Sequence, residues 1–182
     1  MAILKIARMG QPVLRRVAEP VPDPAAPELR RLIADMGETM RDAPGVGLAA
    51  PQVFAGMRLI VFQAPADRVG VDDAATPETV LINPVIKPLT DDLALGWEGC
   101  LSAPGLRGLV PRWKRIGYAG FLPDGTFVER EASGFLARVI QHEYDHLEGL
   151  LYIDRMHDLR LLVCEEEMDG FRYEDYVDSD DE

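Results

Sequence analysis

The spacing of apolar residues predicts three helices along the chain. The first is expected over about residues 27–41, since its apolar residues recur every three or four positions. The second is expected over about 134–148, where Ser133 suits the cap before the first turn and Gly149 the position after the last. The third is expected over about 158–168, with leucines and a valine on one face. Each helix is predicted to pack its apolar face against a core.

Short runs of β-branched and large apolar residues predict strands between the first two helices. Two such runs lie at 58–62 and 79–83. Two more, at 115–121 and 126–130, flank Pro123-Asp124-Gly125, a sequence typical of a hairpin turn. Because the strands cluster before the second helix and do not alternate with helices, the pattern favours an α+β fold. We expect mixed or antiparallel strands packed around that helix as the centre of a single domain.

Charge changes the picture at the C-terminal end. The chain has 182 residues and a formal net charge of -12, but ten acidic residues and one basic residue fall within 165–182. The remainder is therefore nearly neutral. We predict one domain over 1–169, followed by an acidic, flexible tail over 170–182. A nearly neutral body lacks the basic surface of a nucleic-acid-binding protein or of a protein that binds anionic membranes.

The sequence also indicates the compartment. It contains no apolar run long enough to span a membrane, and its N-terminal segment lacks the features of a secretory signal. Two cysteines, Cys100 and Cys164, are too few for a disulfide scaffold. We therefore expect a cytoplasmic protein, in which Cys164 packs into the core from the predicted third helix.

The clearest chemical signal is an H-E-x-x-H pattern in the predicted second helix. Residues four apart lie on one helix face, so His142 and His146 can hold one metal ion while Glu143 reaches a water molecule. The alternative is a helix with two unrelated histidines, one of them paired with Asp145. The chain has only three histidines, and two of them occur here. The pattern therefore indicates a metal site.

A catalytic site of this kind needs a third protein ligand. Cys100, in the segment Glu98-Gly99-Cys100-Leu101-Ser102, is the best candidate, because a thiolate is a strong ligand for iron or zinc. A lone cysteine is otherwise a small buried apolar residue. The acidic residues 165–167 and His157 are the other candidates, but His157 has the wrong spacing for an extended H-E-x-x-H motif.

A third segment, residues 45–52, reads GVGLAAPQ. Its small residues let another chain approach the backbone closely. Gln52 brings an amide donor of the kind that stabilises an oxyanion. A phosphate-binding loop is excluded, since no Lys-Ser or Lys-Thr pair follows. A tight structural turn explains this segment equally well when it is taken alone.

Together the three segments resemble the three motifs of the peptide deformylases, in the same order. The likeness covers about residues 5–156 and rests on five blocks: PVLR at 12–15, GVGLAAPQ at 45–52, EGCLS at 98–102, LVPR at 109–112 and QHEYDH at 141–146. It implies an enzyme that removes the formyl group from N-formylmethionyl peptides, that is, from nascent chains at the ribosome, and releases formate.

The resemblance also implies the roles of individual residues. It implies one divalent metal ion, Fe²⁺ in the cell and replaceable by Zn²⁺, Ni²⁺ or Co²⁺, held by Cys100, His142 and His146. Glu143 is then the general base for the attacking water. The amide of Gln52 and the backbone N–H of Leu101 bind the oxyanion.

The same resemblance indicates a peptide-binding pocket. It places Gly47 and Gly99 beside the substrate backbone, and Val46 and Phe135 around the methionine side chain. Arg138 stands where many bacterial deformylases carry an aliphatic residue. We expect its stem to line the pocket with its charge pointing outward, or else a changed side-chain preference. Residues 105–108 are expected to form a tight loop at the mouth.

Two other functions compete with this one. An endopeptidase also uses H-E-x-x-H, but the cysteine upstream of the helix and the lack of a secretory segment argue against it. A non-catalytic peptide-binding protein would have no need of the complete set of chemical residues. All five are present: Gln52, Cys100, His142, Glu143 and His146.

Overall fold

The computed structural model describes residues 2–70 and 75–176. Its two α-helices are α1 (Leu29–Asp42) and α2 (Gly134–Leu147). The strands among the described residues are β1 (Gly47–Ala49), β2 (Leu59–Ala64), β3 (Thr76–Pro88), β4 (Leu93–Cys100), β5 (Ala103–Trp113), β6 (Arg115–Phe121), β7 (Phe127–Ser133) and β8 (Leu162–Cys164). No helix within the described residues is long and apolar enough to cross a membrane.

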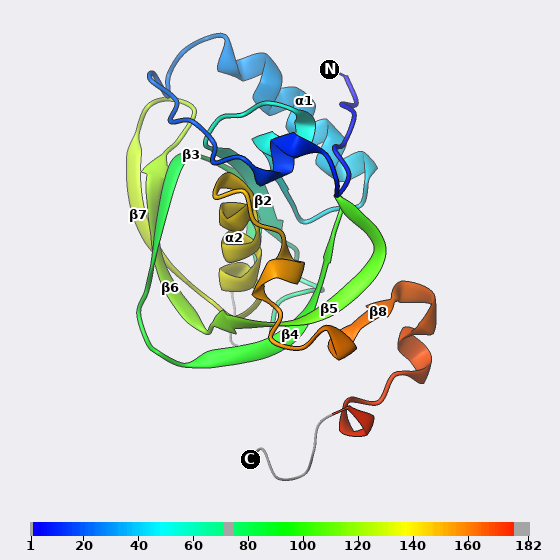
Figure 1. Cartoon of the computed structure of the whole chain (residues 1–182). Coiled ribbons are helices and arrows are strands. Elements are labelled where there is room, and N and C mark those ends of the chain that lie inside the picture. The colour runs from blue at the N-terminus through cyan, green and yellow to red at the C-terminus, as the bar shows by residue number, and fades with distance from the viewer. Residues whose placement is uncertain (1, 71–74, 177–182) are drawn as a thin grey trace.

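The strands form two antiparallel sheets. One has five strands in the order β1-β2-β3-β6-β7, and the other has three in the order β4-β5-β8. Figure 1 shows α2 in the middle of the molecule, with strands of both sheets around it. The predicted α+β single domain with antiparallel strands is therefore confirmed.

The larger sheet is covered on both faces, because alternate residues of β2 point to opposite sides. Ile60 and Phe62 belong to a buried cluster with Ile140 of α2. Leu59 and Val61 belong to a second cluster with methionines of α1. This alternation follows from the two-residue period of a strand. Because α2 packs its apolar face on this sheet, its other face, which is turned toward β4 and β5, is free for polar side chains.

Most of the local elements that the sequence predicts are present in the structure. Both long helices, the strands at 58–62 and 79–83 and the hairpin around Asp124 are confirmed, with shifts at their ends. The hairpin of β4 and β5 is not predicted by the sequence pattern, and its register changes between Gly99 and Cys100. Residues 105–108 lie within β5 and are therefore not the tight loop that was predicted.

The predicted third helix is wrong. Residues 158–168 contain a short 3₁₀-helix (Leu159–Leu161), strand β8 and the start of another 3₁₀-helix. β8 pairs with Leu106, Arg107 and Gly108 of β5, and this long-range pairing outweighs the local helical spacing. Cys164 is exposed at the end of β8, so the prediction that it packs in the core is also wrong.

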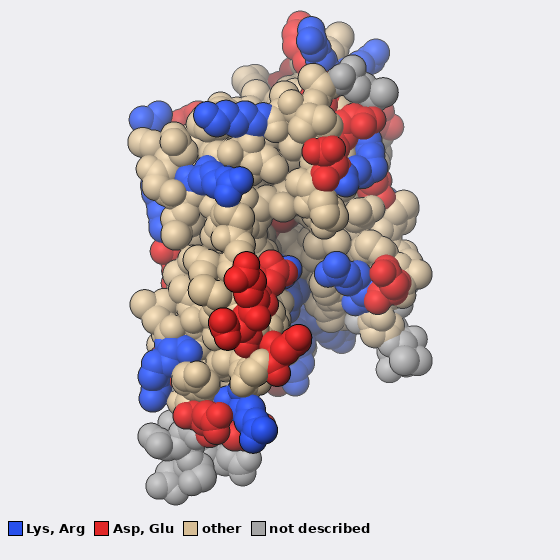
Figure 2. Space-filling model, turned by 90° about the vertical axis from the view of Figure 1, so that its right-hand side faces the viewer, with Lys and Arg blue, Asp and Glu red and all other residues tan. Residues whose placement is uncertain are grey.

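The first part of the predicted tail contacts the domain. Phe171 packs edge to face on Trp97 of β4, with ring centroids 5.0 Å apart, and stacks on Tyr176. Acidic side chains gather on the molecular face seen in Figure 2, and residues 165–167 of the C-terminal segment are exposed. Residues 177–182 lie outside the described residues. The domain boundary at 169 and the flexibility of the tail stay predictions.

Candidate active site

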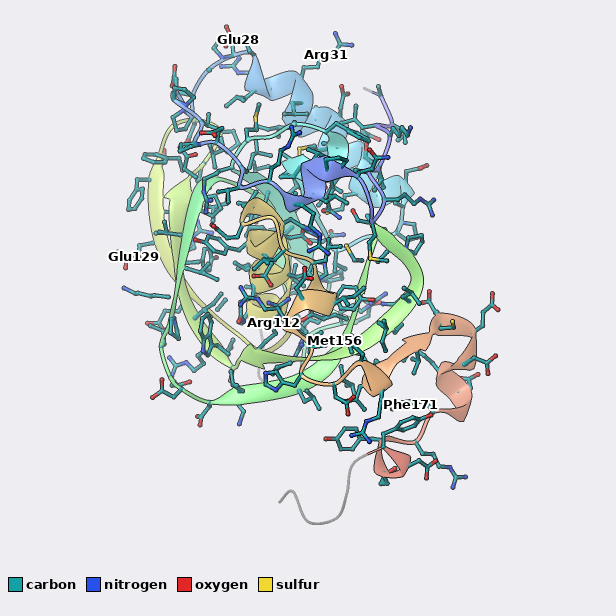
Figure 3. The ribbon with its side chains drawn as sticks, in the orientation of Figure 1. Glu28, Arg31, Arg112, Glu129, Met156 and Phe171 are labelled. Carbon is teal, nitrogen blue, oxygen red and sulfur yellow. The ribbon has the colours of Figure 1, made fainter. Side chains whose placement is uncertain are left out.

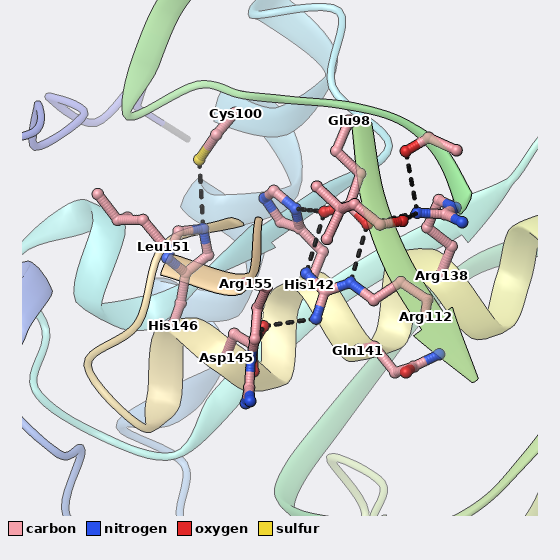
Figure 4. A network of polar contacts seen from close by, with 12 residues as sticks. Glu98, Cys100, Arg112, Arg138, Gln141, His142, Asp145, His146, Leu151 and Arg155 are labelled. Atoms are coloured by element: carbon pink, nitrogen blue, oxygen red, sulfur yellow. Dashed lines mark hydrogen bonds and ion pairs between the residues drawn. The ribbon is translucent and has the colours of Figure 1, made fainter. Parts of the chain in front are cut away.

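Three potential metal ligands meet between α2 and the end of β4. The donor atoms of Cys100, His142 and His146 all lie within 4.8 Å of one another, and Cys100 Sγ is 3.3 Å from His146 Nε2. The two histidines lie one turn apart on α2. The regular pairing of β4 with β5 ends at the change of register between Gly99 and Cys100, and there the sulfur of Cys100 faces the histidines. Figure 4 shows the sulfur of Cys100 facing the ring of His146.

The chemistry of these donors fits a divalent transition-metal ion. Burial opposes ionisation of the Cys100 thiol, but the charge of His146 and hydrogen bonds with both histidines hold the pKa of Cys100 well below its ordinary value. A thiolate with two imidazoles is a donor set suited to iron or zinc. Three protein ligands also leave a coordination position open, as catalytic sites require.

Glu98 orients one of the two histidines. Its Oε2 atom lies 2.8 Å from Nδ1 of His142, which leaves the Nε2 atom of that ring for a metal ion. Arg112 donates two further hydrogen bonds to the same carboxylate, of 2.9 and 3.0 Å. Burial opposes ionisation of Glu98, but the hydrogen bonds from His142 and Arg112 outweigh it and lower its pKa far below the ordinary value. In the sequence, Glu98 has no signal beyond its place in the segment that contains Cys100.

A chain of charges continues behind the histidines, with Arg112 and Asp145 buried and Arg155 exposed. Arg112 donates a hydrogen bond of 2.5 Å to Asp145, which also accepts hydrogen bonds from Arg155. Asp145 is therefore paired with arginines and not with a histidine. Figure 3 shows Arg112 in the interior of the molecule, in contrast to Glu28 and Arg31 at the surface. The signal for Arg112 was its place in the LVPR block, to which no role was assigned.

Glu143 lies next to His142 on α2, and its carboxylate is buried. Burial raises the pKa of Glu143 to about 7, against the opposing effect of the charges on His142 and His146. Its Oε2 atom is buried and has no hydrogen-bond partner among the described residues. A Cβ atom added to Gly47 would lie 2.2 Å from Glu143 Oε1. The carboxylate therefore occupies the space that a side chain at position 47 would fill.

The side chain of Gln52 lies next to Cys100. Its Oε1 atom accepts a hydrogen bond of 2.8 Å from the backbone N–H of Ala49, which fixes the orientation of the amide. Its Nε2 atom is thereby turned toward Ser102 Oγ, at 3.1 Å, and Cys100 Sγ, at 3.5 Å. Leu101 follows Cys100 in the turn between β4 and β5. The backbone N–H of the next residue, Ser102, lies 3.4 Å from the same sulfur, and Leu101 lines the cavity beside it.

A cavity of about 510 Å³ opens onto these residues. All five residues predicted to bind substrate line it: Val46, Gly47, Gly99, Phe135 and Arg138. Gln52, Cys100, Leu101, His142 and Glu143 also line it. His157, the rejected ligand candidate, is exposed outside the lining.

The expected orientation of Arg138 is wrong. Its guanidinium does not point outward but donates hydrogen bonds to Glu98 and to backbone carbonyl groups of β4 and β5. Only 14% of the side chain is exposed. Burial of the charge is possible because carbonyl oxygens and a carboxylate surround it.

Antiparallel sheets around a helix that carries two of three clustered candidate metal ligands, with a buried carboxylate next to them, are the arrangement expected of a metal-dependent hydrolase. The chain belongs to the polypeptide deformylase family, whose model matches residues 3–161.

Relatives of known sequence and structure agree with this assignment. The chain is 56% identical over 154 residues to peptide deformylase 1 of Bordetella pertussis, covering 85% of this chain and 88% of that one. It is 50% identical over 178 residues to peptide deformylase 1 of Xanthomonas campestris pv. campestris, covering 98% and 99%. A Met-Ala-Ser-bound crystal structure of the class I type b peptide deformylase from Acinetobacter baumannii is similar, with a TM-score of 0.78, 34% identity and coverage of 85% and 99%.

Proposed function

We propose that the cavity beside Cys100 and Glu143 receives the formyl end of an N-formylmethionyl peptide, which is hydrolysed there to release formate. The family reaction is the metal-dependent removal of the formyl group from nascent peptides. One observation carries the assignment of residues: the buried carboxylate of Glu143 and the cluster of Cys100, His142 and His146 line or adjoin one cavity. The Met-Ala-Ser peptide bound by the Acinetobacter deformylase supports a peptide ligand.

Cys100, His142 and His146 would hold one divalent metal ion, which we propose to be Fe²⁺ in the cell and replaceable by Zn²⁺, Ni²⁺ or Co²⁺. When bound, such an ion supplies a Lewis acid that polarises a carbonyl group and lowers the pKa of water. We assign this activity to the cytoplasm, on nascent chains at the ribosome. The nearly neutral body supports an enzyme that acts on the peptide without binding RNA.

Glu143 is the proposed general base. A carboxylate with a pKa of about 7 can take a proton from the attacking water and return it to the leaving amine at neutral pH. Its unpartnered Oε2 atom is available to hold that proton. The reaction therefore needs only one acid–base residue, used twice.

Gln52 and Leu101 are the proposed oxyanion donors. The amide of Gln52 is fixed through its Oε1 atom, so its Nε2 atom keeps its place as charge develops on the formyl oxygen. The backbone N–H of Leu101 follows directly after Cys100. Two preorganised donors at this point stabilise the tetrahedral state more than the planar amide.

The remaining cavity residues are proposed to hold the peptide. Gly47 and Gly99 keep side chains away from the substrate backbone, while Val46 and Phe135 surround the methionine side chain. Gly99 is in addition covered by Arg107, whose guanidinium would lie 2.5 Å from an added Cβ atom. Arg138 contributes the stem of its side chain to the same wall.

Formate release tests the proposed function. The anaerobically purified protein is expected to hold metal and to release formate from formyl-Met-Ala, and to lose this activity when a chelator removes the metal. Added Fe²⁺ or Co²⁺ should restore it, because the ligands remain in place. An unformylated peptide with several internal bonds serves as the control. Cleavage of that peptide without formate release would identify an endopeptidase and contradict the proposal.

Gly47→Ala is expected to lower kcat for formate release about 100-fold, because the new Cβ atom displaces the Glu143 carboxylate from its place. Thermal unfolding of the variant should stay close to that of the wild type. Gly56→Ala is the matched control, since nothing lies within 4 Å of a Cβ atom added there. Equal loss of activity in both variants would show that the contact with Glu143 is not the cause.

A further inference from the structure

Arg138 connects α2 to both strands of the β4–β5 hairpin. Its Nη1 atom donates to Val110 O at 2.8 Å and to Gly96 O at 3.2 Å, and its Nη2 atom donates to Ala94 O at 2.6 Å. Gly96 and Val110 are opposite each other in the hairpin. One guanidinium thus binds backbone carbonyl groups of both strands of the hairpin.

The hairpin has a space that fits this guanidinium. A Cβ atom at Gly96 would lie 2.7 Å from Nη2 and 2.8 Å from Cζ of Arg138. The absence of a side chain at position 96 therefore lets the arginine lie flat against β4. Gly96 and Arg138 form a complementary pair, 42 residues apart in the sequence.

The same arginine reaches the carboxylate that orients a metal ligand. Arg138 Nη1 donates to Glu98 Oε1 at 2.9 Å, while Glu98 Oε2 lies 2.8 Å from His142 Nδ1. Arg138 and His142 are four residues apart on α2, on the same face. The contacts therefore close a ring: Glu98 joins the side chains of Arg138 and His142, and α2 joins their backbones. Figure 4 shows Glu98 between the side chains of Arg138 and His142.

We propose that Arg138, seated on Gly96, is a positioning residue of the metal centre: it fixes Glu98, and through Glu98 the ring of His142. This inference rests on the proposed metal ligands and on the proposed function. The competing role for a cation in the cavity wall is to bind an acidic side chain of the peptide. That role is disfavoured, because the guanidinium already donates to four acceptors of the protein and the whole side chain is only 14% exposed.

The effect on the metal follows from the contacts. Without Arg138, Glu98 keeps its bonds to Arg112 but loses the donor that ties Oε1 to α2. The hydrogen bond to His142 Nδ1 then becomes more variable, and the imidazole is held less firmly toward the ion. Loss of partners that orient a ligand typically weakens metal binding 10- to 100-fold, and Arg138 acts one contact further away. We expect Co²⁺ to dissociate about tenfold faster from Arg138→Met.

The test compares cobalt-loaded variants. Transfer of Co²⁺ to a competing chelator gives its dissociation rate, and the visible absorption of Co²⁺ reports its coordination. Arg138→Met is expected to release Co²⁺ about tenfold faster, to shift the absorption bands and to lower kcat with little change in KM for formyl-Met-Ala. Arg138→Lys should fall between, since an ammonium cannot reach all four acceptors. Arg115→Met is the matched control, because Arg115 forms an exposed ion pair with Glu131 on the larger sheet and does not bind Glu98.

Gly96→Ala provides an independent arm. It is expected to speed Co²⁺ release in the wild-type background by pressing on the guanidinium, and to add little in the Arg138→Met background. Wild-type rates of Co²⁺ release in Arg138→Met, with a raised KM alone, would overturn the proposal in favour of substrate binding. A lowered melting temperature with unchanged Co²⁺ release would overturn it in favour of a purely structural role. Absence of formate release by the wild type would refute the proposed function, while the ranking of cobalt release rates would still decide the role of Arg138.

Discussion

Glu143→Gln is expected to lower kcat for formate release about 1,000-fold while the protein keeps its metal ion. The amide has nearly the same shape as the carboxylate but cannot accept the proton of the attacking water. Since Glu143 is not one of the three proposed ligands, metal content and the Co²⁺ absorption spectrum should remain those of the wild type. The residual rate comes from the oxyanion donors and from substrate binding.

The control for this variant is Glu131→Gln. Glu131 lies on β7 and forms an exposed ion pair with Arg115, so its substitution is expected to leave kcat unchanged. Formate release and metal content are measured on the same preparations. If Glu143→Gln retained more than about a tenth of the wild-type kcat, another group would have to be the general base.

Glu98→Ala is expected to destabilise the folded protein by about 3–5 kcal/mol. The substitution removes the carboxylate partner of Arg138 and of Arg112, and Arg112 is 5% exposed. When a buried charge loses its partner, water cannot take the partner's place. The decrease in the free energy of unfolding is therefore much larger than for a surface pair. Arg112 retains Asp145, which keeps the effect within this range.

Urea unfolding of the metal-free proteins measures this difference without a contribution from the ion. Glu129→Ala, which breaks an exposed pair with Lys87, is the control and should change the free energy of unfolding by less than about 1 kcal/mol. Equal stability of Glu98→Ala and Glu129→Ala would show that the buried network is not what holds β4 and β5 to α2. Faster metal loss from Glu98→Ala is expected as well, since His142 loses its acceptor.

The part of the site that lies within one segment was predictable from the sequence. The spacing of His142, Glu143 and His146 on a helix is set locally, and so is the apolar face that buries the helix. Cys100 was predicted by the chemistry of its side chain and by the resemblance to a family, because no local pattern determines what a cysteine 42 residues upstream will face.

The buried charges could not be predicted in the same way. Glu98, Arg112 and Asp145 each read as ordinary polar residues, and their pairing appears only when the hairpin lies on the helix. The orientation of Arg138 depends on a space at Gly96 that only the fold creates. β8 likewise adopts extended structure because an edge of β5 is available, against its own helical spacing.

The position of Cys100 on a different layer from the two histidines has a thermodynamic consequence. An ion held by all three side chains would act as a cross-link between the hairpin and α2, because the unfolded chain does not bring these groups together. Folding and metal uptake are then one linked equilibrium. At a free metal concentration of about 100 times the dissociation constant, the linkage adds about 2.7 kcal/mol to the stability of the fold. Removal of the ion would thus lower the stability of this protein as well as its activity.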